Sequence, residues 1–125
     1  MLLVRTRLGP SAIHGLGVFA VAPISPGTEV WRFTPGFDLE LDPALVERQP
    51  EHVREWLLVY GYLDPRLKRF ILCCDDARFI NHSATPNLRP DFARERHGVD
   101  VALREIAAGE ELTVDYALVD GILPD

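Results

Sequence analysis

The sequence predicts a single β-rich α+β domain. Its apolar residues gather in short runs of branched and aromatic side chains, and turns containing Gly or Pro separate these runs at close intervals, which is typical of short strands. One stretch in the middle of the chain instead has apolar residues at helical spacing. A length of 125 residues, 47% of them hydrophobic, suffices for one core that does not depend on disulfides or metals.

The first half of the chain is expected to hold three strands and two helices. Asp42 and Pro43 are typical of a helix start, because they supply an N-cap side chain followed by proline at the first helical position. Pro50 can begin a second helix, in which apolar residues recur at helical spacing as far as Tyr60. The expected elements are strands at 2–8, 18–21 and 28–33, and helices over 44–48 and from 50 onward.

The second half is expected to be almost entirely strands and loops. Residues 69–74 form a continuous apolar run typical of a buried strand, and residues 99–103 alternate between apolar and polar. Further strands are expected at 77–80 and 111–116, while the charged residues 91–96 predict a strand end or an exposed loop.

The charge composition limits the classes of molecule that the protein is expected to bind. The formal net charge of −6 and the pI of about 5.1 argue against direct binding to nucleic acid, whose phosphates repel an acidic surface. The same charge favours a basic peptide or protein partner, although a mild negative charge also serves solubility alone.

Cysteine usage and hydropathy suggest a cytoplasmic protein without membrane contact. Cys73 and Cys74 are adjacent and cannot form an ordinary structural bridge with each other, so we expect free thiols and no cysteine-based zinc site. Residues 1–5 contain too short an apolar run for a signal peptide, and the longer run from Trp56 to Leu63 is far short of a membrane span.

Three short motifs have residue types suited to binding or catalysis. The first is Gly15-Leu16-Gly17, where missing side chains either form a hairpin turn or let the backbone approach a ligand closely. It is not a dinucleotide-binding fingerprint, because the third glycine is missing and no long helix follows.

The second motif is Asn81-His82-Ser83, which follows an apolar segment and ends in Pro86-Asn87. Asn81 and His82 are either hydrogen-bonded loop residues, the commonest outcome for such groups, or ligands for a bound molecule. The match to an N-glycosylation sequon is interpreted as accidental. A metal site that combines His82 with the cysteines or other histidines has no supporting spacing, and we expect none.

The third motif, from Gly109 to Tyr116, reads Gly-Glu-Glu-Leu-Thr-Val-Asp-Tyr. Periodicity alone interprets Tyr116 as a core aromatic residue, and Tyr60 and Tyr62 likewise. Taken together and in this order, the three motifs resemble the signature segments of the SET-domain protein-lysine methyltransferases, and specifically the minimal bacterial and viral members. The resemblance covers about residues 4–117 of a single domain spanning 1–125, with 118–125 as a short tail.

The resemblance implies a fold and a set of site residues. It implies a β-clip fold of small curved sheets with a C-terminal pseudoknot, in which the last strand threads under the Asn-His-Ser loop and brings Asn81, His82 and Tyr116 together. Tyr116 would be the catalytic tyrosine. The residues implied to bind or support S-adenosyl-L-methionine are Gly15, Leu16, Gly17, Arg78, Phe79, Asn81 and His82. Tyr60, Tyr62 and Val114 are candidates for the lysine channel.

The chain also departs from the family. Ala84 stands where a cysteine often follows Asn-His-Ser, and the flanking cysteine-rich, zinc-binding segments of many relatives are absent. Val114 stands where relatives often have an aromatic residue, which leaves more room for added methyl groups. The tail is short, so residues 118–123 or a partner subunit in a homodimer would have to complete the cover of the site.

The function implied is methyl transfer from S-adenosyl-L-methionine to the lysine ε-amine of a basic protein, such as a histone-like or ribosomal protein. Two alternatives stay open from the sequence. One is a catalytically weak SET-like module that binds a basic peptide or protein, and the other is a structural domain in which the motifs are fortuitous.

Overall fold

The fold is described here from a computed structural model, which describes residues 1–119. Residues 120–123, which belong to the segment considered above as a cover for the site, lie outside this range. In the first half the elements are β1 (Thr6–Pro10), β2 (Leu16–Ala20), β3 (Glu29–Arg32), β4 (Leu39–Leu41), α1 (Pro43–Glu47), α2 (Glu51–Tyr60) and β5 (Gly61–Asp64). In the second half they are β6 (Arg69–Leu72), the 3-10 helix η1 (Asp76–Phe79), β7 (Asn81–His82), β8 (Leu88–Asp91), β9 (Val99–Ala102), β10 (Thr113–Val114) and α3 (Tyr116–Val119).

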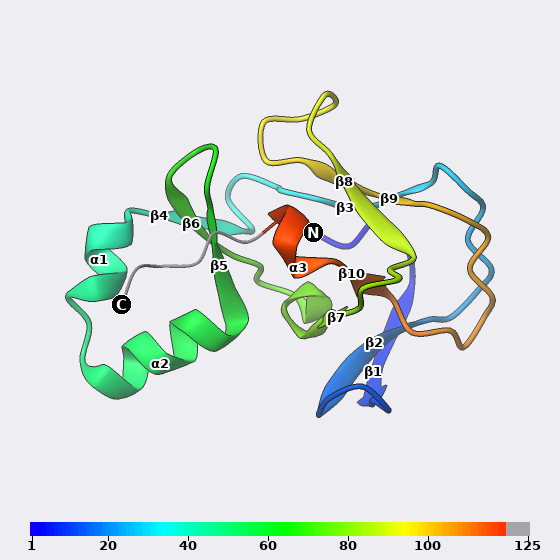
Figure 1. Cartoon of the computed structure of the whole chain (residues 1–125), viewed down its shortest axis with the longest axis horizontal. Helices are drawn as coiled ribbons and strands as arrows, with labels where there is room; N and C mark the ends of the chain where they lie inside the picture. Colours follow the sequence, from blue (N-terminus) through cyan, green and yellow to red (C-terminus); the bar gives the residue numbers. More distant parts are fainter. Residues whose placement is uncertain (120–125) are drawn as a thin grey trace.

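The strands form several small sheets instead of one large one. Two three-stranded antiparallel sheets have the orders β3-β9-β8 and β4-β6-β5, and β1 pairs with β2 as an antiparallel hairpin. Figure 1 shows the sheet β4-β6-β5 with α1 and α2 on one side of the molecule and the other two sheets on the opposite side, with β7, β10 and α3 between them. The predicted β-rich fold of small sheets with little helix is confirmed.

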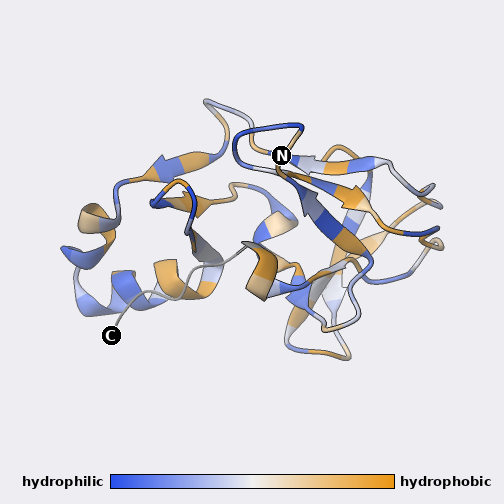
Figure 2. Cartoon of the chain, turned by 45° about the horizontal axis from the view of Figure 1, so that its top comes forward, coloured by the Kyte–Doolittle hydropathy of each residue, from blue (hydrophilic) through white to orange (hydrophobic). Residues whose placement is uncertain are grey.

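Both predicted helices are present. The side chain of Asp42 accepts a hydrogen bond from the Ala44 N–H, and Pro43 occupies the first turn of α1, as the sequence predicts. Figure 2 shows that α2 carries both hydrophobic and hydrophilic residues. It buries Leu57 against Val46, Phe70 and Leu72, so packing onto the sheet β4-β6-β5 holds this short helix in place. No helix within residues 1–119 is long and apolar enough to cross a membrane.

The hydrophobic core is divided among the sheets. The largest cluster joins the β1-β2 hairpin to the sheet β3-β9-β8 and includes Val18, Val30, Leu88, Ile106 and Leu112, all fully buried. A second cluster links the two three-stranded sheets through Trp31, Phe33, Ile71 and Cys73. Because Trp31 lies on β3 and Ile71 on β6, this cluster fixes how the sheets face each other.

A parallel pairing between β7 and β10 closes the fold. Thr113 pairs with Asn81 and Val114 pairs with His82, although 30 residues lie between the two strands in the sequence. The buried amide of Asn87 extends this contact, since it accepts from the Thr113 N–H at 2.8 Å and donates to the Glu111 carbonyl at 2.8 Å. This is the contact that the expected pseudoknot requires between the last strand and the Asn-His-Ser segment.

Two predicted strands are wrong in detail. Residues 77–80 were expected to form a strand, but the side chain of Asp75 accepts a hydrogen bond from the Ala77 N–H and caps the 3-10 helix η1 there. The strand expected over 111–116 is limited to β10, because the chain turns at Asp115 and enters α3 at Tyr116. The first strand begins later than expected, at Thr6, and β4, β5 and β8 were not anticipated as separate strands.

The contact made by Asn87 can be tested by substitution. We expect Asn87→Ala to lower the free energy of unfolding by about 2 kcal/mol, because the buried Thr113 N–H then loses its partner. Urea denaturation measures this change. Thr85→Ala, an exposed change in the same loop, serves as the control and should stay within about 0.5 kcal/mol of the parent protein. Equal stabilities for the two variants would contradict the role given to Asn87.

Candidate functional site

The side chain of Asn81 joins the three sequence motifs. Asn81 is buried, and its Nδ2 lies 3.0 Å from the Leu16 carbonyl and 3.1 Å from the His14 carbonyl. The same nitrogen lies 3.1 Å from Ser11 Oγ and 2.9 Å from Glu111 Oε2. One amide group therefore fixes the glycine loop at residues 14–17 against the segment that leads into β10.

Gly17 is required by this network. A Cβ atom on Gly17 would lie 2.5 Å from Glu111 Oε2, and that carboxylate is held by Ser11 Oγ and Asn81. Glu111 belongs to the third motif, but the sequence alone assigned it no role. Its position as a charged residue directly before an apolar strand was the signal that could have identified it as a hydrogen-bond acceptor.

Gly15 has a different reason to be glycine. Its φ of +48° lies in the left-handed region, and no atom lies within 4 Å of the position that a Cβ would take. The neighbouring side chain of Leu16 is exposed. The loop thus has open space beside Gly15, while Asn81 holds the carbonyls on either side of it.

His82 and Tyr116 are in direct contact. The Tyr116 N–H donates to His82 Nδ1 at 3.0 Å, and the two ring centroids are 5.2 Å apart. The Tyr116 hydroxyl donates to the Ile80 carbonyl at 2.7 Å, so the tyrosine bridges the residue before β7 and the residue at its end. Asn81, His82 and Tyr116 therefore lie in one place, as expected from the resemblance.

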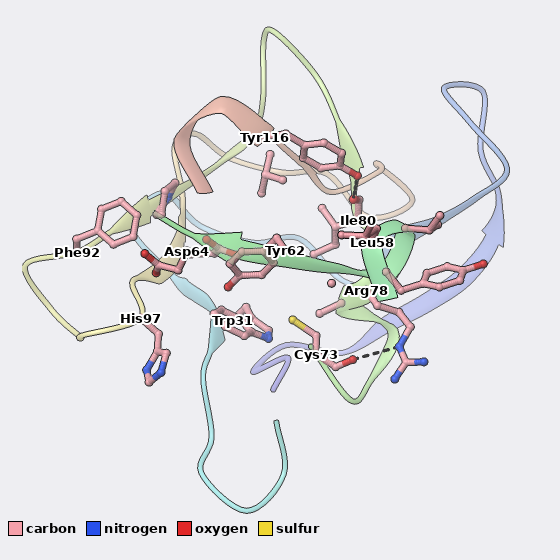
Figure 3. A pocket seen from close by; sticks show the side chains of 17 residues that line it. Trp31, Leu58, Tyr62, Asp64, Cys73, Arg78, Ile80, Phe92, His97 and Tyr116 are labelled. Atoms are coloured by element: carbon pink, nitrogen blue, oxygen red, sulfur yellow. Dashed lines mark hydrogen bonds between the residues drawn. The ribbon is translucent and has the colours of Figure 1, made fainter. Parts of the chain in front are cut away.

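A cavity of about 330 Å³ lies next to Tyr116. Figure 3 shows residues of β3, α2, β5 and η1 around it, and the hydroxyl of Tyr116 hydrogen-bonded to Ile80 at one edge. Among the predicted site residues, those that line the cavity are Tyr60, Tyr62, Arg78, Val114 and Tyr116. The glycine loop and the Asn81-His82 pair are not among its lining residues.

The two residues predicted to support the loop have other contacts. Arg78 donates from Nε to the Cys73 carbonyl at 3.1 Å, and its guanidinium lies 5.3 Å from the ring centroid of Trp56. Phe79 packs edge-on against Tyr60, with 5.5 Å between ring centroids. Both lie on η1, immediately before Asn81, so they position the start of β7; a role in cofactor binding stays a prediction.

Burial shifts several pKa values at the cavity. It raises the pKa of the Tyr62 hydroxyl and of the Cys73 thiol well above their usual values, and neighbouring acidic groups add to both shifts. Both groups are therefore protonated near neutral pH. Burial also raises the pKa of Asp100 to about 7, an effect that the Met1 amino group partly offsets. Asp100 lines the cavity together with Trp31.

The sequence model of the SET domain matches residues 15–117. The chain belongs to the SET-domain family. The chain is 31% identical over 118 residues to a Schizosaccharomyces pombe protein named histone-lysine N-methyltransferase, H3 lysine-4 specific, a match that covers 90% of this chain. It is 32% identical over 122 residues to the Drosophila virilis histone-lysine N-methyltransferase trithorax, with 85% of this chain covered. The chain spans only 13% and 3%, respectively, of the length of these two relatives.

Solved structures with the SET domain share the fold. An apo form of ctPRC2 with substitutions in Ezh2 aligns with a TM-score of 0.72 and 24% identity, covering 94% of this chain and 16% of that one. A humanised mutant of the Chaetomium thermophilum Polycomb Repressive Complex 2 aligns with a TM-score of 0.65 and 23% identity, covering 95% and 16%. At these identities the likeness concerns the fold.

The shifted pKa of Asp100 makes stability depend on pH. Between about pH 4 and pH 7 the folded protein keeps a proton on Asp100 that the unfolded chain has released, so this residue lowers stability as the pH rises through that window. Asp100→Asn cannot titrate. We therefore expect its free energy of unfolding, relative to the parent protein, to increase by a few kcal/mol between about pH 5 and pH 8.

Urea denaturation of both proteins across that range measures the difference. Other ionisable groups interact with Asp100 or line the cavity with it, and they cancel in the comparison because both proteins contain them. These groups are the Met1 amino group, Tyr60, Tyr62, Asp64, Cys73, Arg78, His97 and Tyr116. A difference that is constant with pH would show that Asp100 has an ordinary pKa in the folded protein.

Proposed function

We propose that this chain transfers methyl groups from S-adenosyl-L-methionine to the lysine ε-amine of a protein substrate. One observation carries the proposal: the pairing of β7 with β10 sets Tyr116 beside a cavity while Asn81, in the same pairing, holds the glycine loop. Family membership supports it, and so do the names of the relatives, which are histone-lysine N-methyltransferases.

The glycine loop and the Asn81-His82 pair fit a cofactor with polar ends. There is open space beside Gly15, the Leu16 side chain is exposed, and His82 is exposed with a ring that contacts Tyr116. These three residues, with Gly17 and Asn81, would hold S-adenosyl-L-methionine, which supplies a methyl group on a positively charged sulfur. Because the binding groups are largely main-chain atoms, the position of the loop decides affinity, and Asn81 sets that position.

The cavity suits the amine of a lysine. A lysine amine has a pKa of about 10.4 in water and must lose its proton before it can attack a methyl group. The apolar walls formed by Trp31, Ile80 and Val114 withdraw the amine from water, and this desolvation lowers its pKa. The cavity therefore favours the neutral form that reacts.

Tyr116 and the Ile80 carbonyl would orient that amine. Their 2.7 Å hydrogen bond places a hydroxyl and a carbonyl oxygen side by side at the edge of the cavity. An amine held by these two oxygens has its lone pair fixed in direction, and alignment of the reacting groups is the main requirement of a displacement at a methyl carbon. Tyr60 and Tyr62 line the same cavity, and the protonated Tyr62 hydroxyl is a further hydrogen-bond donor there.

The substrate is proposed to be a basic protein. The net charge of −6 favours a basic partner, and the relatives' names, one of which specifies histone H3 lysine 4, favour a histone-like tail over a ribosomal protein. Val114 is a small side chain on the cavity wall, so we propose that the cavity accommodates an amine that already carries methyl groups. The cytoplasmic location and the homodimer expected above stay predictions.

Substitution of Tyr116 tests the catalytic role. We expect Tyr116→Phe to lower the rate of methyl transfer by about 100-fold or more, because the amine loses an orienting hydroxyl. Incubation with labelled S-adenosyl-L-methionine and core histones, followed by counting of the methylated protein, measures the rate. The affinity for S-adenosyl-L-methionine should change little, which calorimetric titration checks. Full turnover in the variant would exclude this role, and a parent protein that binds basic peptides but transfers no methyl group would favour the binding module instead.

Substitution of Asn81 tests the cofactor site. We expect Asn81→Ala to weaken the binding of S-adenosyl-L-methionine by about tenfold or more, since the glycine loop loses the amide that fixes it. Calorimetric titration measures the affinity. Ser83→Ala is the control, because within residues 1–119 the hydrogen bonds of the Ser83 side chain are made with Thr85. This variant should bind the cofactor as the parent protein does. Equal affinities for the Asn81 variant and the parent protein would contradict this assignment.

A further inference from the structure

Asp100 lies in the middle of a cavity wall. It belongs to β9, the central strand of its sheet, and its direct neighbours are Trp31 on β3 and Pro90 on β8. Residues directly opposite each other in antiparallel strands project from the same face of a sheet. All three residues line the cavity, so the carboxylate of Asp100 is flanked by an indole ring on one side and a proline ring on the other.

Asp100 differs from the other charged side chains of the cavity because it is unpaired. Asp64 accepts hydrogen bonds from the Arg66 and Leu67 N–H groups and pairs with the Arg66 guanidinium. Arg78 donates to the Cys73 carbonyl. Within residues 1–119, the side chain of Asp100 has neither a hydrogen bond nor an ion pair, and it is half-buried, so its carboxylate is accessible from the cavity. The Nε1 of Trp31, the residue opposite Asp100, is buried without a partner, which is costly unless a ligand satisfies it.

The walls around Asp100 favour an organic cation. Trp31, Tyr62 and Phe92 present aromatic rings to the cavity, and aromatic faces attract ammonium and guanidinium groups. The Phe92 ring already has this property in the structure, because the guanidinium of Arg66 lies 3.6 Å from its centroid. A carboxylate together with aromatic walls selects a cation over a neutral hydrogen-bond donor.

The cation is better assigned to a second basic residue than to the lysine that reacts. A carboxylate beside the reacting amine would stabilise its ammonium form, which cannot attack a methyl group. Room is available, because a cavity of about 330 Å³ lies in the range of about 300–1,000 Å³ that is typical of ligand pockets.

We propose that Asp100, with Trp31 and Tyr62, forms a subsite that binds the ammonium or guanidinium group of a basic substrate residue other than the methylated lysine. The identity of the ligand as a protein substrate rests on the function proposed above. The subsite makes Asp100 a specificity-determining residue: it selects substrates that carry a second Lys or Arg near the target. Because the carboxylate binds the cation only when it is ionised, substrate affinity falls as the pH is lowered through about 7.

Trp31 allows the occupancy of this subsite to be observed directly. The chain has two tryptophans, so Trp56→Phe leaves Trp31 as the single indole, located in the cavity. In this background, a peptide of the histone H3 tail is titrated at about pH 8 while the Trp31 emission is followed. We expect Asp100→Asn to weaken peptide binding by about tenfold or more, as for the loss of a charge-assisted contact, with unchanged affinity for S-adenosyl-L-methionine.

Asp91→Asn is the matched control. It removes the same charge from β8 in the same sheet, but Asp91 pairs with Arg94 and does not line the cavity. It should bind the peptide as the parent background does. Equal binding by the Asp100 variant, or an equal loss in both variants, overturns the proposal. The melting temperature of each variant shows whether it is folded. The pH dependence of peptide binding by the parent background is a second test, which needs no substitution at Asp100. A peptide affinity that is independent of pH between about 6 and 8 overturns the proposal.

Modified peptides identify which side chain enters the subsite. Each Lys is replaced in turn by norleucine and each Arg by citrulline, and the Asp100 variant is compared with the parent background on every peptide. The proposal expects one replacement, away from the methylated lysine, to abolish the difference between the two proteins. If replacement of the methylated lysine itself abolishes it, the assignment to a second residue is overturned.

The outcomes separate this inference from the function itself. Methyl transfer that proceeds with the same KM in the Asp100 variant supports the function and overturns the subsite. Peptide binding that depends on Asp100 in a protein without methyl transfer supports the subsite and contradicts the function.

Discussion

Two buried asparagine amides maintain the crossing of distant chain segments on which the site depends. Asn87 accepts from the Thr113 N–H and donates to the Glu111 carbonyl, and Asn81 contacts the glycine loop and the Glu111 carboxylate. A side-chain amide can donate and accept at the same time, so it can join segments that no regular sheet connects. Without these bonds the two-residue pairing of β7 with β10 would be too short to hold its register.

The crossing brings together two groups of residues with different chemistry. Asn81 holds the glycine loop, and the adjacent His82 is exposed, a combination that suits a polar, charged cofactor. Ile80 and Tyr116 line a cavity with aromatic walls and an unpaired carboxylate, which suits a basic side chain. Under the proposed function, the hydrogen bond between Tyr116 and Ile80 marks where an acceptor amine would be oriented.

The three motifs that meet at the site can be identified from the sequence, but the contacts made by some of their residues cannot. The expectation that Asn81, His82 and Tyr116 lie together was correct because it rested on three motifs in a fixed order. Gly17 was interpreted either as part of a hairpin turn or as a place for close approach to a ligand, whereas it also makes room for Glu111. Asp100 was overlooked, because a polar residue within an alternating strand is usually solvent-exposed, whereas here it lines a cavity together with residues of the neighbouring sheet.

The sequence by itself determined the elements that depend on local chemistry. The start of α1 follows from Asp42 and Pro43, and the many short strands follow from apolar runs broken by Gly and Pro. Tertiary structure decided which segments become neighbours, because contacts between residues far apart in the chain leave no periodic signal. It also decided the local form at residues 113–116, where pairing with β7 overrides the apolar pattern. The form at residues 76–79 is a local effect instead, because Asp75 caps this turn through the Ala77 N–H, two residues along the chain. The charge state of Asp100 belongs to the same class, since burial by distant strands, and not the residue type, sets its pKa.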